Sequence, residues 1–335
     1  MATKIAVIGA GSWGTALAQV LSENCSEVMM YDLNESIIQD INEHHQNSLF
    51  FGSHILPSQI KATSKLQEAL ANTEVVLLSV PTKVMRVVLK DLNEALTHEV
   101  TIVNASKGIE PVTHKRVSEI VSEEINSNYL KAFVALSGPS HAEEVIVRDL
   151  TTVTCASTNS EQANAIQRLF NTSYFRVYRS DDLLGVELGG SIKNVIALAA
   201  GILAGLGYGD NAKAALITRG LVEIKRLGLA LGGQEGTFSG LSGLGDLIVT
   251  CTSVHSRNWQ AGFSIGQGSD LKATLDQMTM VVEGVRTCEA TYQLAKELNI
   301  EMPIVETVYE VIFNYLEPKV AVANLMSREI KPEFY

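Results

Sequence analysis

Three glycines near the start of the chain constrain its fold more than any other feature. Gly9, Gly11 and Gly14 have the spacing G-x-G-x-x-G, directly after the apolar run 5–8 and directly before the helix-forming run 15–21. In a strand, turn and helix of this kind, the first glycine allows a tight turn, the second lets the backbone approach a pyrophosphate, and the third lets the helix pack on the sheet. The N–H groups that begin such a helix favour an anion. The motif predicts a dinucleotide-binding site; the alternative is a strand–turn–helix without a ligand.

A carboxylate bears on the choice of cofactor. A second predicted strand, 27–31, ends in Asp32, about 20 residues after the glycines, as dinucleotide-binding folds require. A carboxylate at this place accepts hydrogen bonds from a ribose diol and repels a 2′-phosphate, and Leu33, Asn34 and Glu35 supply no cation. NAD(H) is therefore favoured, and NADP(H) stays open. The alternative is that Asp32 only caps the next helix, a role that Asn34 can also fill.

The first half of the chain alternates between strand-like and helix-like segments. Such alternation predicts an α/β fold, a Rossmann-type doubly wound and mostly parallel sheet with helices on both faces. After about residue 181 the pattern is helical throughout, so we expect a nucleotide-binding domain over 1–182 and an all-helical substrate-binding domain over 183–335. We expect the junction at a long helix that starts near Leu183, with a cleft between the domains. The predicted strands are 74–80, 100–105, 132–136, 151–155 and 174–178, and the predicted helices are 84–96, 113–125 and 160–170.

Composition and charge exclude several classes of function. A chain of 335 residues suggests about two domains. The net charge of −11 disfavours nucleic acid and anionic membranes as partners, because both require basic surfaces. The apolar stretch 195–206 is shorter than a membrane span and predicts a buried helix rather than membrane insertion.

The cysteines and the first residues indicate the compartment. The four cysteines have no metal-binding spacing, which is typical of a reducing compartment, and we expect no metal. The first residues show no signal-peptide pattern, so we expect a cytoplasmic protein.

Several polar residues that lie among small residues are candidates for catalysis or ligand binding. In the first half, Lys107 follows a predicted strand, and Ser140 and His141 follow another, where Ser140 could cap the next helix. In the second half, Lys193 and Asn194 lie within an apolar helix, where a solvated lysine is unusual.

Two further clusters lie later in the chain. A glycine-rich turn presents Asp246, which could lie near Lys193. The run Ser256, Arg257 and Asn258 combines a guanidinium with a helix start, a combination that suits a phosphate, although Ser256 could simply cap the helix.

Taken together, these motifs resemble bacterial-type NAD(P)-dependent sn-glycerol-3-phosphate dehydrogenases, over nearly the whole chain. The resemblance implies reversible hydride transfer between NAD(P)H and dihydroxyacetone phosphate, giving sn-glycerol 3-phosphate for glycerophospholipid biosynthesis. The motifs that carry it are 9–14, 106–108, 137–140, 190–195, 243–246, 256–258 and 282–284.

The resemblance also implies roles for individual residues. Lys193 matches the catalytic lysine of the family. The matching substrate contacts are Lys107, Gly138, Ser140, Lys193, Asp246, Ser256, Arg257 and Asn258. The matching cofactor contacts are Ser12, Trp13, Lys107, Ala142, Arg257, Val281 and Glu283, in addition to Gly9, Gly11, Gly14 and Asp32 of the nucleotide motif. One position differs, because bacterial members often carry a basic residue where this chain has Leu33.

The implied chemistry suits the residue types. Hydride addition to a ketone creates alkoxide character, which an ammonium group such as that of Lys193 can stabilise and protonate. Burial or Lys107 would lower the pKa of Lys193, and Asp246 would oppose this, so the direction stays open at this stage.

Two other functions stay open on the residues alone. A related β-hydroxyacid dehydrogenase would use the same two domains and a lysine on a carboxylate substrate, and a non-catalytic protein could sense NAD(H). The cluster of Arg257 with Asp246 favours a phosphate ester over the first, and the presence of Lys193 argues against the second. By analogy with the fold, we also expect a homodimer.

Overall fold

The nucleotide-binding half is built on one eight-stranded sheet. The computed structural model describes residues 4–278 and 281–333. The strands lie in the order β3-β2-β1-β4-β5-β6-β7-β8, and neighbours are parallel except for the antiparallel pair β6–β7. This confirms the mostly parallel sheet. The strands are β1 (Lys4–Ile8), β2 (Glu27–Tyr31), β3 (Ile60–Thr63), β4 (Val75–Leu78), β5 (Val100–Asn104), β6 (Leu130–Ser137), β7 (Thr151–Ala156) and β8 (Phe175–Ser180).

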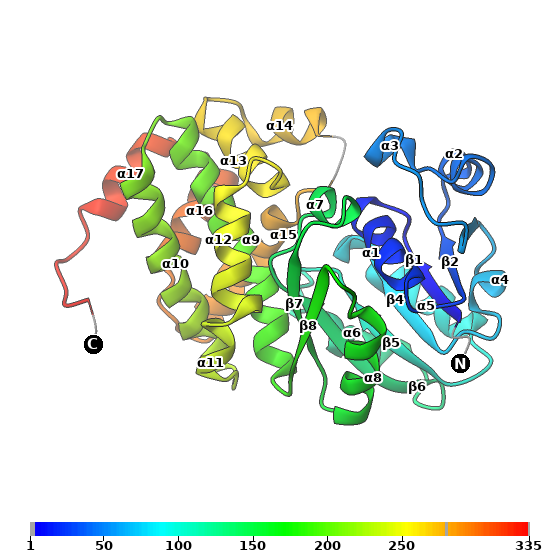
Figure 1. Ribbon diagram of the computed structural model, residues 1–335. Helices are drawn as coiled ribbons and strands as arrows, with labels where there is room; N and C mark the ends of the chain where they lie inside the picture. Colours follow the sequence, from blue (N-terminus) through cyan, green and yellow to red (C-terminus); the bar gives the residue numbers. More distant parts are fainter. Residues whose placement is uncertain (1–3, 279–280, 334–335) are drawn as a thin grey trace.

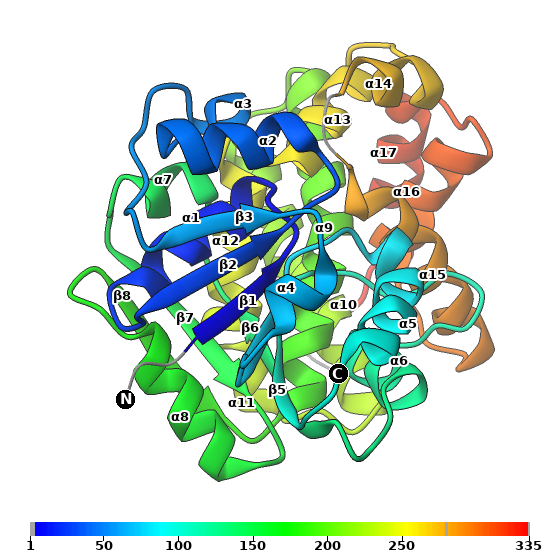
Figure 2. The same ribbon diagram turned by 90° about the vertical axis from the view of Figure 1, so that its right-hand side faces the viewer.

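Helices cover both faces of this sheet, as Figure 2 shows. One face packs on α1 (Ser12–Ser22), α2 (Glu35–Gln39), α7 (Ala142–Ile146) and α8 (Ser160–Phe170); the other packs on α4 (Leu66–Leu70), α5 (Met85–Ala95) and α6 (Val117–Glu124). Because both faces are covered, the central strands are rich in apolar residues, as in β4, where every residue is apolar and buried. Shorter turns of helix, η1 (Asp40–His44), α3 (Ser48–Phe51) and η2 (Thr82–Val84), connect these elements.

The second half is helical throughout its described residues, and it stands beside the sheet (Figure 1). Its helices are α9 (Leu183–Gly205), α10 (Asp210–Ala230), α11 (Glu235–Phe238), η3 (Leu241–Gly245), α12 (Asp246–Thr252), α13 (Arg257–Gly266), α14 (Leu271–Gln277), α15 (Glu283–Glu297), α16 (Pro303–Phe313) and α17 (Pro318–Met326). Helix α9 begins at Leu183, as the sequence predicts, and β8 ends at Ser180. The domain boundary between 182 and 183 stays a prediction that agrees with these bounds.

Helix α9 is the centre of the helical half. By length and composition it could cross a membrane, but 83% of its most apolar window is buried inside the protein, as in a core helix. Two glycines bring it against α13. A Cβ on Gly201 would lie 2.0 Å from the Trp259 carbonyl oxygen, and a Cβ on Gly262 would lie 2.1 Å from that of Leu198. The two backbones are therefore in contact, and no larger residue fits at either position.

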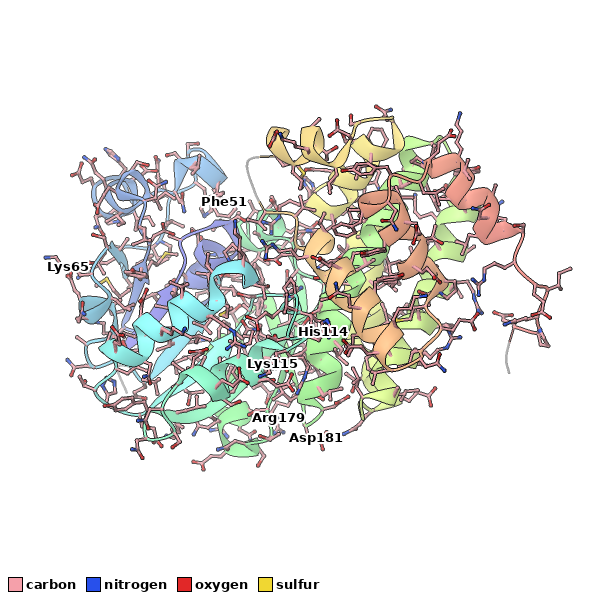
Figure 3. The ribbon with its side chains drawn as sticks, turned by 180° about the vertical axis from the view of Figure 1, so that it is seen from behind. Phe51, Lys65, His114, Lys115, Arg179 and Asp181 are labelled. Carbon is pink, nitrogen blue, oxygen red and sulfur yellow. The ribbon has the colours of Figure 1, made fainter. Side chains whose placement is uncertain are left out.

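Two local predictions differ from the structure. The strand β3 is absent from the predicted elements, because its four residues, Ile-Lys-Ala-Thr, carry too little pattern to be seen. The helix predicted at 113–125 begins only at Val117, because Val112 and His114 have φ values of 74° and 57°, which a helix excludes. The irregular segment places His114 against α15, where its Nε2 lies 3.1 Å from Gln293 Oε1 (Figure 3).

Candidate active site

A cleft of about 360 Å³ lies between the two halves and collects most of the predicted site residues. It is lined from the sheet side by the loops after β1, β4, β5 and β6, and from the helical side by α9, α12 and the start of α13. The predicted residues on its walls are Gly11, Ser12, Trp13, Lys107, Ser140, Ala142, Lys193, Asp246, Ser256, Arg257, Asn258, Val281 and Glu283. Gly9, Gly14, Asp32 and Gly138 are not among the residues that line it.

Two lysines and one aspartate form the polar centre of the cleft. Lys193 Nζ donates hydrogen bonds to Asp246 Oδ1 and, over 2.7 Å, to Thr250 Oγ1. Lys107 Nζ reaches the other carboxylate oxygen of Asp246 over 2.8 Å. Lys193 comes from the middle of α9, Asp246 from the first turn of α12, and Lys107 from the loop after β5. One carboxylate thus joins a cation of the helical half to a cation of the nucleotide-binding half.

Burial sets the electrostatics of this centre. Desolvation lowers the pKa of Lys193 to about 7, since its side chain is 6% exposed; Asp246 opposes this decrease and Lys107 adds to it. Desolvation acts to raise the pKa of Asp246, but Lys107 and Lys193 outweigh it, and the net pKa lies below the ordinary value. The direction that the sequence leaves open is therefore downward for Lys193. A group with a pKa near neutral pH can both give and accept a proton, as reversible general acid–base chemistry requires.

The three glycines do what the motif predicts at the backbone level. Gly9 has a φ of +104°, and a Cβ there would lie 2.6 Å from the Ser79 carbonyl oxygen. A Cβ on Gly14 would lie 2.0 Å from the Gly9 carbonyl oxygen, so helix α1 packs tightly against the turn. A Cβ on Gly11, by contrast, meets nothing within 4 Å, and no side chain caps α1. The start of α1 thus presents open space and unpaired N–H groups, which fit a pyrophosphate.

Asp32 belongs to this turn rather than to the next helix. Its Oδ2 accepts from the Ala10 N–H over 2.7 Å, and its Oδ1 accepts from the Asn34 N–H over 3.0 Å. Asn34, not Asp32, caps α2, through a bond from the Ser36 N–H. The carboxylate therefore lies at the end of β2 beside the glycine turn, the place where a ribose diol is bound in such folds.

Glu283 supplies an unpaired acceptor in the cleft. Its Oε1 accepts from the Thr82 N–H over 2.9 Å, whereas its Oε2 is buried and has no partner among the described residues. Desolvation raises its pKa, although Thr82 and Arg257 act in the opposite direction. A buried carboxylate oxygen without a donor is costly, so this atom fits a ligand that brings a donor.

The start of α13 forms the opposite end of the cleft. Ser256 caps the helix by accepting from the Trp259 N–H over 3.3 Å. Arg257 is half-buried; desolvation lowers its pKa, and its Nη1 lies 3.4 Å from the Val281 carbonyl oxygen. The side chain of Asn258 forms its hydrogen bonds within the protein: it donates to Asn194 Oδ1 and accepts from the Gly284 N–H, both over 2.9 Å. A half-buried guanidinium at a helix start suits a phosphate group.

The loop after β6 differs from the prediction in one detail. His141, not Ser140, is the N-cap residue of α7, and Ser140 Oγ instead donates to the Gly138 carbonyl oxygen over 3.0 Å. Ser140 does not cap the helix, because His141 occupies the N-cap position. The same carbonyl accepts from Lys107 Nζ over 3.3 Å. Gly138 therefore acts on the cleft through its backbone oxygen.

The sequence predictions name neither Thr250 nor Phe50, which line the cleft, and give no separate role to Ser137, which contacts Asp246 from the predicted motif 137–140. Thr250 contacts Lys193 and lies one helical turn after Asp246, a spacing that could have indicated it. Ser137 Oγ lies 3.4 Å from Asp246 Oδ2. Phe50 lines the cleft from α3, and nothing in its local sequence distinguishes it from a core phenylalanine.

Comparisons with known proteins cover nearly the whole chain. Family models for the N-terminus and the C-terminus of NAD-dependent glycerol-3-phosphate dehydrogenase match residues 4–163 and 182–323. Glycerol-3-phosphate dehydrogenases [NAD(P)+] of Bacillus cereus (strain G9842) and Bacillus cytotoxicus are each 55% identical over 331 residues, or 99% of this chain and 97% of theirs. The crystal structure of glycerol-3-phosphate dehydrogenase from Coxiella burnetii superposes with a TM-score of 0.93 at 35% identity, covering 98% of this chain and 99% of that one.

Proposed function

The chain belongs to the NAD-dependent glycerol-3-phosphate dehydrogenase family, and from this premise we propose that its cleft interconverts dihydroxyacetone phosphate and sn-glycerol 3-phosphate. The observation that carries the proposal is the buried Lys193–Asp246–Lys107 cluster, which lies in one cleft with Arg257 at the start of α13. The cluster suits proton transfer to a carbonyl, and the helix start suits a phosphate.

The chain's residues fit a nicotinamide dinucleotide. The open backbone at Gly11 would hold the pyrophosphate, and Asp32 would accept hydrogen bonds from the ribose. The unpaired oxygen of Glu283 would accept a hydrogen bond from a donor group of the cofactor. Ser12, Trp13, Lys107, Ala142, Arg257 and Val281 complete the proposed set of cofactor contacts. When bound, the cofactor supplies or accepts the hydride. We infer a preference for NADH, because Asp32 would repel a 2′-phosphate and Leu33 offers no cation.

Lys193 is the proposed proton donor in the reduction. Its ammonium stabilises the negative charge that grows on the carbonyl oxygen and then delivers the proton, and the neutral amine accepts it back in the oxidation. Asp246 and Thr250 fix the direction of Nζ. Lys107 contacts the other oxygen of the same carboxylate, and its positive charge lowers the pKa of Lys193.

Arg257 is the proposed anchor for the substrate phosphate. It shares this task with the N–H groups at the start of α13, while Ser256, Asn258 and Ser140 line the surrounding wall. Gly138 contributes its carbonyl oxygen, which accepts from Lys107. Burial strengthens a charge-assisted hydrogen bond to the phosphate.

We further propose the roles of the two domains, the location and oligomeric state of the enzyme, and the use of its product. Residues 1–182 bind the cofactor and 183–335 bind the substrate, the protein acts in the cytoplasm as a homodimer, and its product serves glycerophospholipid synthesis. These proposals rest on the family resemblance and on the two structural halves.

The deciding experiment measures initial rates of dihydroxyacetone phosphate reduction with NADH and with NADPH at equal concentrations, followed by nicotinamide absorbance. We expect turnover, faster with NADH. A matched variant, Leu33→Arg, should raise the NADPH rate relative to the NADH rate. Absence of turnover with both cofactors would contradict the proposal, and turnover of a β-hydroxyacid in its place would favour that class of dehydrogenase.

A further inference from the structure

A loop without regular structure carries Lys107 into the cleft. It is the connection 105–116 between β5 and α6, which we call the Lys107 loop, and it contains neither helix nor strand. His114 and Lys115, farther along this loop, lie between the two halves of the protein in Figure 3. A segment of this kind is held in place only by the contacts it makes with its surroundings. Lys107 Nζ nevertheless lies 2.8 Å from Asp246 Oδ2 of the helical half, so other contacts must fix the loop.

Glu187 of α9 holds the far end of the Lys107 loop. Its Oε1 accepts from the Ser118 N–H over 2.8 Å. Its Oε2 accepts from Ser118 Oγ over 2.6 Å and from Arg116 Nη1 over 3.0 Å. The Glu187 side chain is 5% exposed, and burial raises its pKa against the opposite effects of Arg116 and Ser118. Since a buried carboxylate is costly unless donors bind it, these three bonds tie the start of α6 to α9.

Ser191 holds the loop directly beside Lys107. It lies one helical turn after Glu187 in α9 and is buried. Its Oγ accepts from the Gly108 N–H over 3.0 Å and donates to the Glu187 carbonyl oxygen over 2.7 Å. A buried backbone N–H requires an acceptor, so Ser191 fixes the backbone of the residue that follows Lys107.

The packing around these two contacts is close. A Cβ on Gly190 would lie 2.5 Å from Ser137 Oγ at the end of β6, so this turn of α9 touches the nucleotide-binding half. Ile109, two residues after Lys107, is buried and belongs to the hydrophobic core of the helical half. The Lys107 loop is therefore bound to the helical half at three places: through Gly108, through Ile109 and through the start of α6.

We propose that Glu187 and Ser191, together called the α9 clamp, are positioning residues that hold the Lys107 loop so that Lys107 stays on Asp246. Neither clamp residue lines the catalytic cleft, so both act through the loop. Helix α9 then sets the position of both lysines, since it carries Lys193 itself and holds Lys107 through the clamp. The inference rests on the proposed function, because its effect on catalysis is measured at Lys193.

Release of Lys107 should change the proton affinity of Lys193. Burial lowers the pKa of Lys193 most, Lys107 lowers it further, and Asp246 acts in the opposite direction. If the loop loosens, the charge of Lys107 moves away and the Asp246 carboxylate is left to Lys193 alone. Both changes favour the ammonium form, so reduction should continue to higher pH. His141 and Cys251 also face Lys193, from the start of α7 and from α12, and neither belongs to the Lys107 loop.

The test combines hydrogen exchange over residues 105–118 with the pH profile of kcat/KM for dihydroxyacetone phosphate reduction by NADH. Ser191→Ala removes the acceptor of the Gly108 N–H. Glu187→Gln removes the charge that binds Arg116. The two variants are measured singly and combined, each with its thermal midpoint, in the full-length protein.

Two matched controls carry the same substitutions away from the Lys107 loop. Ser22→Ala removes a buried serine hydroxyl that donates to the Gln19 carbonyl oxygen of α1 over 2.7 Å. Glu223→Gln changes a buried carboxylate of α10 that accepts from the Ile304 N–H over 2.7 Å at the start of α16. Both controls should keep the wild-type exchange over 105–118 and the wild-type pH profile.

In both clamp variants, and most in the double variant, we expect the amides of 105–118 to exchange about tenfold faster or more. In the wild type, the rate of reduction should fall as the pH rises through the Lys193 pKa of about 7. In the clamp variants this fall should move to higher pH by about one pH unit. A clamp that only stabilised the fold would lower the thermal midpoint and leave the position of the fall unchanged.

Unchanged exchange in Ser191→Ala would overturn the inference, and so would faster exchange with an unchanged pH profile. If Glu187→Gln does not fold, Ser118→Ala replaces it, since it removes one bond of the same contact. A wild type without turnover would contradict the proposed function instead, and the exchange comparison would still decide whether the clamp holds the loop.

Discussion

Removal of the charge on Asp246 should change how the enzyme depends on pH. In Asp246→Asn, Lys193 loses its anionic partner and stays close to Lys107, so its ammonium form is destabilised twice. Opposite charges about 4 Å apart interact by about 4 kcal/mol at an effective dielectric constant of about 20. At about 1.4 kcal/mol for each tenfold change, the proton affinity of Lys193 should fall by about three orders of magnitude.

The effect on the rate follows from the protonated fraction of Lys193. In the wild type, a pKa of about 7 leaves about half of the lysine protonated at pH 7. In the variant the protonated fraction at pH 7 is much smaller, so reduction of dihydroxyacetone phosphate at pH 7 should fall by about 100-fold or more. The loss should shrink as the pH is lowered, and the acid limb of the oxidation profile should move to lower pH.

The assay records kcat/KM in both directions across the pH range in which the fold is stable. Glu306→Gln is a matched carboxylate-to-amide control, because Glu306 pairs with Lys296 at the surface. NADH binding and the thermal midpoint show whether Asp246→Asn is folded. A loss of activity that is the same at every pH would refute the assignment of Lys193 as the proton donor under the control of Asp246.

Three further predictions test other parts of the structure. Lys193→Ala should lower kcat by about 100- to 10,000-fold and leave NADH affinity, measured by fluorescence titration, nearly unchanged; near-normal turnover would exclude its role. Arg257→Ala should raise the KM for dihydroxyacetone phosphate by about 10- to 100-fold, with a smaller effect on kcat, because it removes a charge-assisted bond to the phosphate; an unchanged KM would exclude the anchor. Burial raises the pKa of Glu223 to about 7, so the folded state binds more protons than the unfolded state, and stability should decline as the pH rises from about 4.5 to about 7. Glu223→Gln should flatten that decline in the thermal midpoint, and an unchanged slope would contradict it.

The sequence was informative wherever one residue type has one physical explanation. Gly9 and Gly14 could be placed because a side chain at either position would collide with the backbone, and Gly11 because its position faces open space, as the structure shows. Lys193 could be singled out because a lysine inside an apolar helix requires a partner. Its pairing with Asp246, which the sequence suggested, is present in the structure.

The sequence was least informative where a role depends on distant contacts. The direction of the pKa change at Lys193 depends on how deeply it is buried and on two groups far along the chain, and neither can be read from local sequence. In the sequence Thr250 is an ordinary helical threonine, and its contact with Lys193 depends on the packing of α9 against α12. Ser140 was predicted as a cap, but its hydroxyl bonds to Gly138, because the turn before α7 places His141 at the helix start.

The contact between α9 and α13 restricts how the cleft can move. Gly201 and Gly262 press the two helix backbones together, so the part of α9 that carries Lys193 and the part of α13 that carries Arg257 belong to one rigid body. Any closing motion must then carry Lys193 and Arg257, the proposed proton donor and phosphate anchor, together toward the turn at Gly9–Gly14. The fold thereby sets the distance between Lys193 and Arg257, and this distance limits the length of a substrate that can contact both. A homologous substrate one carbon longer should bind its phosphate at Arg257 and present the wrong atom to Lys193.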